Sequence, residues 1–373
     1  MERKFNVTGT CVPTEDYMVD ITEKLVQIKI MIDRREYFTI NRGRQYGKTT
    51  TLSQLKLFLA NEYTVISISF EGFGSVAFET EERFCQTFLK TVKKALRFSG
   101  VTNEYREAWI NDEIKAFSDL SDHITDLCED KKVVLMIDEV DKASNHVIFL
   151  DFLSKLRDKY LSRKVEEDFT FHSVILAGVY DIKNLKLKMI QEGIYAPIET
   201  ETTTYNSPWN IASTFKVDMA FSEAEIAGML VEYEEDHQTG MNIDDISKEI
   251  SEYTSGYPVL VSSICKYIDE ELSRDWTTAG VRRAVKLILK EKTPLFDNLI
   301  KNLDSNKSLF SLLSYMVLNS RNWSFNPDDE MINIGMRYGY LKENNGKVEI
   351  ANKIFKVRLL NYFTAKKRKR SNC

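Results

Sequence analysis

The sequence predicts an α/β protein built around a parallel sheet that is covered by helices. In about the first 210 residues, short β-branched or aromatic runs alternate with long amphipathic stretches, which is the pattern of strands joined by helical crossovers. The run at 133–137 is apolar throughout, as expected of a strand that is buried on both faces of such a sheet.

Each element of this half is predicted from its own pattern. Short runs rich in β-branched and aromatic residues indicate strands, and longer amphipathic stretches indicate helices. We expect strands at 37–41, 64–70, 133–138, 171–178 and 215–220. We expect helices at 50–60, 79–98, 107–129 and 147–161.

The strand signals stop at about residue 222, which is the clearest boundary in the chain. Amphipathic helices follow at 222–234, 243–253, 258–272 and 277–289. From residue 307 the pattern is different again, with helices at 308–318 and 328–336 and short runs at 340–343 and 347–351. The turn Asn344-Asn345-Gly346 separates the two short runs, and an Asn-Gly turn in this position is a strong hairpin signal. Helices followed by a hairpin predict a winged helix.

Length and composition set limits on the class of protein. A chain of 373 residues is long enough for two or three domains, and 43% hydrophobic with 29% charged residues is typical of a folded globular protein. No apolar run approaches the roughly 20 residues that a membrane span needs, and residues 1–7 lack the apolar region of a secretion signal. We therefore expect a cytoplasmic protein with no membrane partner.

Cysteine, histidine and net charge exclude other classes. The five cysteines have no paired spacing and the chain holds four histidines, so neither a disulfide framework nor a zinc site is predicted. The net charge of −5 argues against a protein that coats nucleic acid.

The strongest chemical signal is the segment 41–50, Asn-Arg-Gly-Arg-Gln-Tyr-Gly-Lys-Thr-Thr, between a predicted strand and a predicted helix. Phosphate binding needs inward-pointing backbone N–H groups and a helix N-terminus, so a glycine must allow close approach. We expect Gly47 to supply this approach, Lys48 to bridge the β- and γ-phosphates and Thr49 to bind Mg²⁺. The full pattern has glycine where this chain has Arg42, and the neighbouring Gly43 is expected to form that turn. The predicted phosphate contacts are Gly43, Arg44, Gln45, Tyr46, Gly47, Lys48, Thr49 and Thr50.

A second motif, which is acidic, follows about 90 residues later. The apolar strand at 133–137 ends in Asp138-Glu139, and open parallel sheets bind ligands at the carboxyl ends of their strands. Asp138 is expected to hold Mg²⁺, and Glu139 to orient and deprotonate the attacking water. A Gly-Lys-Thr triplet alone also fits a surface loop, and the two acids alone could cap the next helix. The two motifs in this order and spacing favour ATP hydrolysis.

These residues resemble the AAA-like ATPases of bacteria, AAA+ P-loop NTPases of the origin-recognition and STAND branch. The likeness rests on the Arg-Gln-Tyr-Gly-Lys-Thr loop and the Leu-Met-Ile-Asp-Glu strand, and it extends over about residues 5–363. It also includes the segments 17–20, 174–181 and 256–258. The resemblance implies an AAA+-like core with a parallel sheet at 1–221, a helical lid at 222–304, a winged-helix domain at 305–365 and a basic tail at 366–373.

The resemblance also implies further site residues. Tyr17 and Val19 correspond to the segment that lies against the adenine, although a strand packed on the core explains them equally well. Tyr180 falls where motor-type relatives carry a polar sensor, usually asparagine. In place of a lid arginine this chain has Gly256-Tyr257-Pro258, the form found in STAND switch ATPases, so Pro258 is a further candidate contact. Arg42 and Arg44 either supply the missing charge or are exposed to solvent.

Two classes of function remain open. The first is Mg²⁺-dependent binding and slow hydrolysis of ATP, used as a nucleotide-dependent conformational switch. The second is a regulatory or scaffold protein that holds a nucleotide while it binds a partner, with hydrolysis incidental. A small-molecule kinase is disfavoured, because such a reaction needs no water-activating Glu139 and no acceptor pocket is evident.

The partners are less well determined than the ATP site. A winged helix often binds DNA, but five cations and five carboxylates balance between 306 and 350, which favours a protein contact. The basic run 366–370 fits nucleic acid, an acidic partner or a solvated tail. AAA+ relatives usually complete their site by forming homo-oligomers. Many relatives continue into a PD-(D/E)XK nuclease-like domain, so we expect such an effector to be missing or supplied by another polypeptide.

Overall fold

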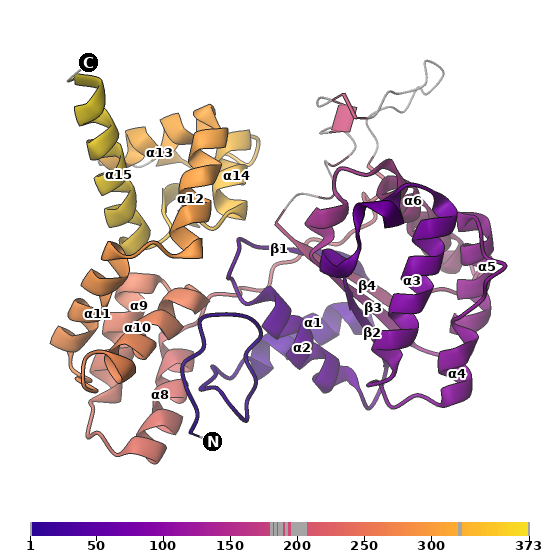
Figure 1. The fold of residues 1–373 in the computed structure, drawn as a ribbon, viewed down its shortest axis with the longest axis horizontal. Helices are drawn as coiled ribbons and strands as arrows, with labels where there is room; N and C mark the ends of the chain where they lie inside the picture. Colours follow the sequence, from indigo (N-terminus) through magenta and orange to yellow (C-terminus); the bar gives the residue numbers. More distant parts are fainter. Residues whose placement is uncertain are drawn as a thin grey trace. The chain divides into compact units, whose positions relative to one another are not determined.

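The structure is a computed structural model that describes residues 2–179, 182, 185, 189, 190, 193, 194, 207–319 and 323–371. The chain forms two compact units. The sheet unit comprises Glu23–Asn41 and Lys48–Val217, and the helical unit comprises Met1–Thr22, Arg42–Gly47 and Asp218–Cys373. The segment Arg42–Gly47 therefore groups with the helical unit, although the residues on both sides of it in the chain group with the sheet unit. Figure 1 labels helices of both units and the four strands of the sheet unit.

A four-stranded parallel sheet forms the centre of the sheet unit. Its strands are β1 (Tyr37–Asn41), β2 (Thr64–Ser69), β3 (Val133–Asp138) and β4 (Ser173–Gly178). The spatial order is β1-β4-β3-β2, so β4 lies between β1 and β3. Every residue of β3 and β4 is buried, which explains why both read as continuous apolar runs rather than as alternating ones.

One helix precedes these strands and others connect them, as parallel pairing requires. They are α1 (Thr22–Asp33), α2 (Lys48–Leu59), α3 (Glu81–Leu96), α4 (Asn103–Ala108), α5 (Phe117–Cys128) and α6 (Val147–Lys164). Short 3-10 turns occur at Phe70–Gly72 (η1), Ser75–Phe78 (η2) and Val140–Ala143 (η3). In Figure 1, α3 and α5 lie on one side of the sheet, and α1 and α2 lie on the other.

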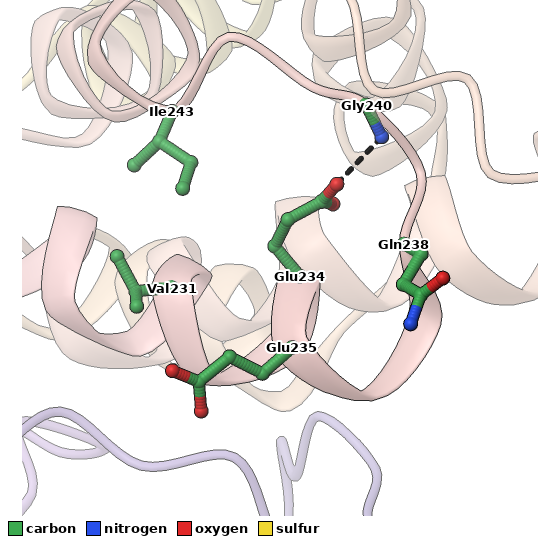
Figure 2. A pocket seen from close by; sticks show the side chains of 6 residues that line it. All are labelled: Val231, Glu234, Glu235, Gln238, Gly240 and Ile243. Carbon is green, nitrogen blue, oxygen red and sulfur yellow. Dashed lines mark hydrogen bonds between the residues drawn. The ribbon is translucent and has the colours of Figure 1, made fainter.

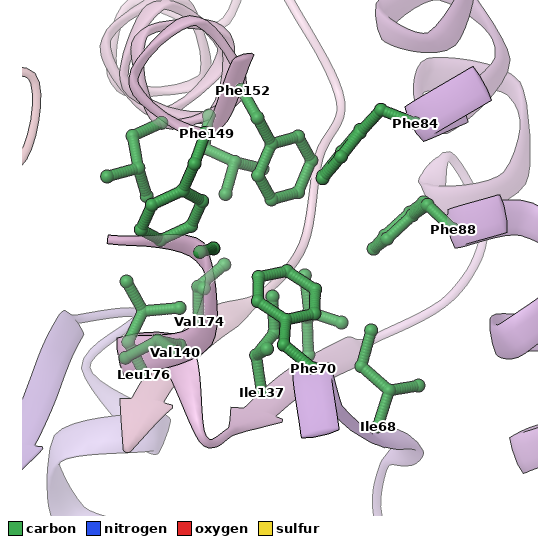
Figure 3. Packing of buried hydrophobic residues seen from close by; sticks show 14 of the residues in the cluster. Ile68, Phe70, Phe84, Phe88, Ile137, Val140, Phe149, Phe152, Val174 and Leu176 are labelled. Atoms are coloured by element: carbon green, nitrogen blue, oxygen red, sulfur yellow. The ribbon is translucent and has the colours of Figure 1, made fainter. Parts of the chain in front are cut away.

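Aromatic rings fill the space between the sheet and α3, α5 and α6. The ring centroids of Phe84 and Phe152 are 5.0 Å apart, and those of Phe70 and Phe149 are 5.8 Å apart. Figure 3 shows these rings above Ile137 and Leu176 of the two central strands. All of these side chains are buried. The carboxyl ends of β3 and β4 are therefore supported by a close-packed hydrophobic core.

Two predicted elements differ in the structure. The helix expected at 107–129 is two helices, because the Asn111 side chain accepts the Glu113 N–H in a local turn and Asp119 accepts the N–H groups of Lys115 and Ala116. Side chains that bond the backbone in this way compete with a continuous helix. The strand expected at 215–220 is wrong: this segment has no ladder, and only an isolated bridge between Phe38 and Ser213 lies near it.

The helical unit begins with four helices in the region predicted to be the lid. They are α8 (Glu223–His237), α9 (Ile243–Thr254), α10 (Pro258–Glu270) and α11 (Thr278–Lys290). The segment before α1 packs on α8: the Phe5 ring lies 5.2 Å from Tyr233, and the Tyr17 hydroxyl donates to Asp236 at 2.8 Å. The predicted division of the whole chain into three domains stays a prediction.

The second part of the helical unit lies in the region predicted to be a winged helix, and we call it the winged-helix part. It contains α12 (Pro294–Ser305), α13 (Lys307–Asn319), α14 (Glu330–Arg337) and the strands β5 (Trp323–Ser324), β6 (Leu341–Asn344) and β7 (Lys347–Ile350), which pair in the order β5-β7-β6. Sequence reasoning did not predict α12. The helix α15 (Lys353–Ser371) continues into residues 366–371, which were predicted to be part of a basic tail. No helix in the described ranges is long and apolar enough to cross a membrane.

A buried ion pair joins α6 to the segment that follows it, and the same lysine also bonds α5, so it should matter for stability. Lys159, whose side chain is 2% exposed, donates to Asp168 at 2.7 Å and to the Ser121 carbonyl at 2.9 Å. We expect Lys159→Ala to lower the free energy of unfolding by about 3 kcal/mol, because it leaves a largely buried carboxylate unpaired. Lys353→Ala, which removes an exposed pair with Glu252, should cost less than about 1 kcal/mol. Equal losses in chemical denaturation would contradict this prediction.

Candidate active site

The carboxyl end of β3 brings the two predicted motifs together. The Thr49 hydroxyl donates to Asp138 Oδ2 at 2.6 Å, although the residues are 89 positions apart in the chain. The other carboxylate oxygen, Asp138 Oδ1, accepts the Glu139 N–H at 2.9 Å. Thr49 lies in the first turn of α2 and Asp138 is the last residue of β3. The hydroxyl and the carboxylate predicted to bind Mg²⁺ are therefore neighbours.

Glu139 follows directly in an unusual backbone conformation. Its φ and ψ are 53° and 40°, a left-handed geometry that costs a residue with a Cβ roughly 1–3 kcal/mol. Burial, and then the nearby Asp138 charge, raise the pKa of Glu139, while Lys48 acts in the opposite direction. A carboxylate with a raised pKa is a stronger proton acceptor, as a general base should be. Glu139 therefore combines a left-handed backbone with a raised pKa at the carboxyl end of β3.

Lys48 opens α2 and is buried, with 7% of its surface exposed. Thr50, in the same turn, is half-buried. Within the described ranges, no group of three or more His, Cys, Asp and Glu could hold a metal ion. The protein ligands predicted for Mg²⁺ are Thr49 and Asp138, and water and phosphate oxygens commonly complete the shell of this ion.

The loop before α2 groups with the helical unit. Gly43 is buried, Arg44 is exposed and Tyr46 is half-buried. Gln45 has a left-handed φ of 57°, and its buried Oε1 accepts no hydrogen bond within the described residues. Gly47 has a φ of 79°, which favours glycine. Pro258, at the start of α10, is the nearest neighbour of a Cβ built on Gly47, at 3.9 Å.

The remaining predicted residues have mixed outcomes. Tyr17 and Val19 are both buried, and the Tyr17 ring packs 5.1 Å from Tyr233 in the helical unit. This packing accounts for Tyr17 as a core residue, and its contact with adenine stays a prediction. Tyr180 lies outside the described residues, so its role as a sensor also stays a prediction.

Sequence reasoning missed Asp141, the third acid of Asp-Glu-Val-Asp. Its Oδ2 accepts the Val179 N–H at 2.7 Å, which ties the turn after β3 to the residue after β4. A Cβ on Gly178 would lie 2.8 Å from Val140 and 2.9 Å from Asp141 Oδ1, so this approach requires glycine. The spacing of Asp141 from Glu139 was visible in the sequence, but its partner on β4 was not.

A second feature with acidic groups is a shallow hollow of about 520 Å³ between α8 and the start of α9. Figure 2 shows Glu234 in it, with its carboxylate bonded to the Gly240 N–H at 2.6 Å. The same carboxylate also accepts the Thr239 hydroxyl. Glu234 thus shapes the turn after α8, and the hollow contains no evident catalytic group.

The Asp141 anchor can be tested through amide exchange. In Asp141→Ala the Val179 N–H loses its acceptor, so its exchange should become about fivefold faster, which corresponds to one hydrogen bond. Hydrogen exchange read by mass spectrometry over the peptide containing Val179 measures the change. Asp119→Ala, which removes backbone acceptors for residues 115 and 116 in the same unit, should leave this peptide unchanged. An unaltered Val179 rate would show that the anchor is dispensable.

Comparisons with known proteins agree with the predicted fold. The chain resembles a Walker-type ATPase of Pyrococcus abyssi at 12% identity and a TM-score of 0.63, over 95% of this chain and 99% of that one. It also resembles the ORC2 protein of Aeropyrum pernix, in its ADPNP-ADP complexes, at 13% identity and a TM-score of 0.51, over 99% and 98%. At these identities the likeness shows the fold. No curated protein matches the chain.

The predicted P-loop NTPase fold with an AAA+-like parallel sheet is thus confirmed. The helical lid and the winged helix stay predictions. A profile of the AAA-like domain matches residues 27–357. Because this match covers most of the 373 residues of the chain, the chain belongs to the AAA-like domain family.

Proposed function

We propose that this protein binds Mg-ATP and hydrolyses it slowly, and that the nucleotide state switches its conformation. The observation that carries the proposal is the hydrogen bond of 2.6 Å between Thr49 and Asp138. This bond brings Thr49, which follows the loop lysine, next to Asp138 at the end of β3. A hydroxyl and a carboxylate in these positions bind magnesium in P-loop enzymes. Membership of the AAA-like family and the Walker-type fold support nucleotide binding in general.

Each residue then has a defined role. Backbone N–H groups of Gly43–Thr50 would bind the phosphates, with the start of α2 adding its partial positive charge. Lys48 would neutralise the β- and γ-phosphates, and Thr49 and Asp138 would hold Mg²⁺, which supplies further charge stabilisation when bound. Glu139 would take a proton from the attacking water, and its raised pKa supports this role.

Slow turnover and switching are inferred from two departures from motor-type relatives. The segment Gly256-Tyr257-Pro258 stands where those proteins carry a lid arginine, and Tyr180 stands where they carry a polar sensor. The position of Pro258 beside Gly47 within the helical unit supports a direct contact between the start of α10 and the loop. An apolar contact of this kind does not stabilise transition-state charge as an arginine would.

Two substitutions test the proposal. Lys48→Ala should weaken ATP binding by about 10- to 100-fold or abolish it, since it removes a charged donor to phosphate. Glu139→Gln should retain binding and lower the hydrolysis rate by about 100-fold or more, because the amide cannot accept the proton. Binding is measured by calorimetry and hydrolysis by phosphate release.

Matched controls separate these effects from general damage. Lys56→Ala, in the same helix, and Glu62→Gln, on a surface pair with Lys29, should leave both quantities near the wild-type values. Hydrolysis that survives Glu139→Gln would remove Glu139 as the base. Hundreds of turnovers per second without a partner would contradict the slow switch.

A second candidate is a regulatory or scaffold protein that holds ATP and binds DNA or a protein partner such as a nuclease, through the winged helix or α15. The basic run of α15 favours it, although Lys366 already pairs with Asp304 at 2.6 Å. If this function holds, partner binding should respond to ATP equally in wild type and Glu139→Gln. Particle size in ATP and in ADP, with and without co-purifying partners, measures this response and any homo-oligomer. Partner binding that requires hydrolysis would favour the first candidate.

A further inference from the structure

The phosphate loop is held by residues from two distant parts of the helical unit. The Tyr257 hydroxyl, from the residue before α10, donates to the backbone carbonyl of Arg44 at 2.8 Å. The rings of Tyr257 and Tyr46 meet edge to face, with centroids 4.6 Å apart. Tyr257 is 2% exposed. Its burial raises the pKa of the hydroxyl well above that of an ordinary tyrosine, so the hydroxyl stays protonated and can donate.

The winged-helix part contributes the turn Tyr338-Gly339 that follows α14. A Cβ built on Gly43 would lie 2.4 Å from the Tyr338 carbonyl oxygen, a distance that only glycine permits. Gly43 is not among the glycines with positive φ, so close approach, and not backbone conformation, requires glycine here. A Cβ on Gly339 would lie 3.2 Å from the Tyr257 ring and 3.5 Å from the Tyr46 ring.

The bond to Arg44 has a specific consequence for the loop. In a trans peptide the C=O and the following N–H point in opposite directions. Holding the Arg44 carbonyl toward Tyr257 therefore fixes the direction of the Gln45 N–H, on the opposite side of that peptide. Backbone N–H groups are the donors with which such a loop binds phosphate, and fixing one before binding lowers the entropy cost of association.

We propose that Tyr257 and the turn Tyr338-Gly339 form a clamp that positions the phosphate loop, so that ATP affinity depends on the winged-helix part of the chain. The proposal rests on the proposed function of ATP binding. Tyr257, Tyr338 and Gly339 are positioning residues in it, because they act through Gly43, Arg44 and Tyr46. It also gives Gly43 a reason to be glycine that differs from the turn expected from the motif.

The test compares two clamp variants with two matched controls. Tyr257→Phe removes one hydroxyl and keeps the ring, and Gly339→Ala adds a methyl group against Tyr257 and Tyr46. Tyr105→Phe removes a similar bond from a tyrosine hydroxyl to a backbone carbonyl, that of Leu127 at 2.9 Å. Gly346→Ala adds a methyl group at a similar φ of 75°, where no atom lies within 4 Å.

The full chain is titrated with an N-methylanthraniloyl derivative of ATP in Mg²⁺, and phosphate release gives kcat and KM. Both clamp variants should raise Kd and KM about fivefold, the equivalent of one hydrogen bond. Their kcat should stay within about twofold of wild type, because only binding is affected. The controls should keep the wild-type Kd, with melting temperatures lowered as much as in the clamp variants.

The outcomes separate the clamp from the proposed function. If wild type does not bind the probe, the proposed function fails and the clamp fails with it. If wild type binds but the clamp variants match it, bind more tightly or weaken no more than the controls, only the clamp is overturned. Should Gly339→Ala fail to fold, Tyr257→Phe alone decides, since it removes a single oxygen atom.

Discussion

The hydrogen bond between the Thr49 hydroxyl and Asp138 is the interaction on which the rest of the site depends. It forms because β1, β4 and β3 are neighbouring parallel strands whose carboxyl ends lie at one edge. The helix that follows β1 thereby presents its first turn near the acid that ends β3. With Asp138 Oδ1 occupied by the Glu139 N–H, both carboxylate oxygens have defined partners and the turn after β3 has little freedom.

The same edge holds Glu139 and Asp141 in fixed positions. Glu139 adopts a left-handed conformation, which the chain keeps because Val140 and Asp141 are packed against Gly178. The bond from the Val179 N–H to Asp141 then links the end of β4 to the same turn. The aromatic cluster of Figure 3 supports these strand ends with buried rings. The strained backbone of Glu139, next to the buried Asp138, persists only because the surrounding packing is rigid.

The helical unit adds a second constraint, on the loop and not on the acids. Its contacts with Gly43, Arg44 and Tyr46 come from residues close to α10 and α14. Nearly all of these contacts involve backbone atoms or glycine, so they depend on how closely the segments approach. The glycine that the usual motif has at the position of Arg42 is found one residue later, where packing against Tyr338 requires it.

Much of the core could be predicted because its signals are local. The strands at 37–41 and 133–138 are confirmed to the residue, since a strand buried on both faces is a continuous apolar run. Lys48, Thr49, Asp138 and Glu139 were identifiable by their order along the chain and their place at element ends. The predicted helix at 107–129 and the strand at 215–220 failed, because side-chain bonds to the backbone and the choice of strand partners are not visible in periodicity.

The sequence by itself therefore determined the fold class and predicted the residues that would carry the chemistry, because both depend on short patterns of residue type. Only the tertiary structure decided that Thr49 bonds Asp138, that Asp141 anchors Val179, and that Tyr257 and Tyr338 contact the loop. The physical reason is the same in each case. A hydrogen bond or a close approach needs a partner from a distant part of the chain, and folding alone brings that partner within reach.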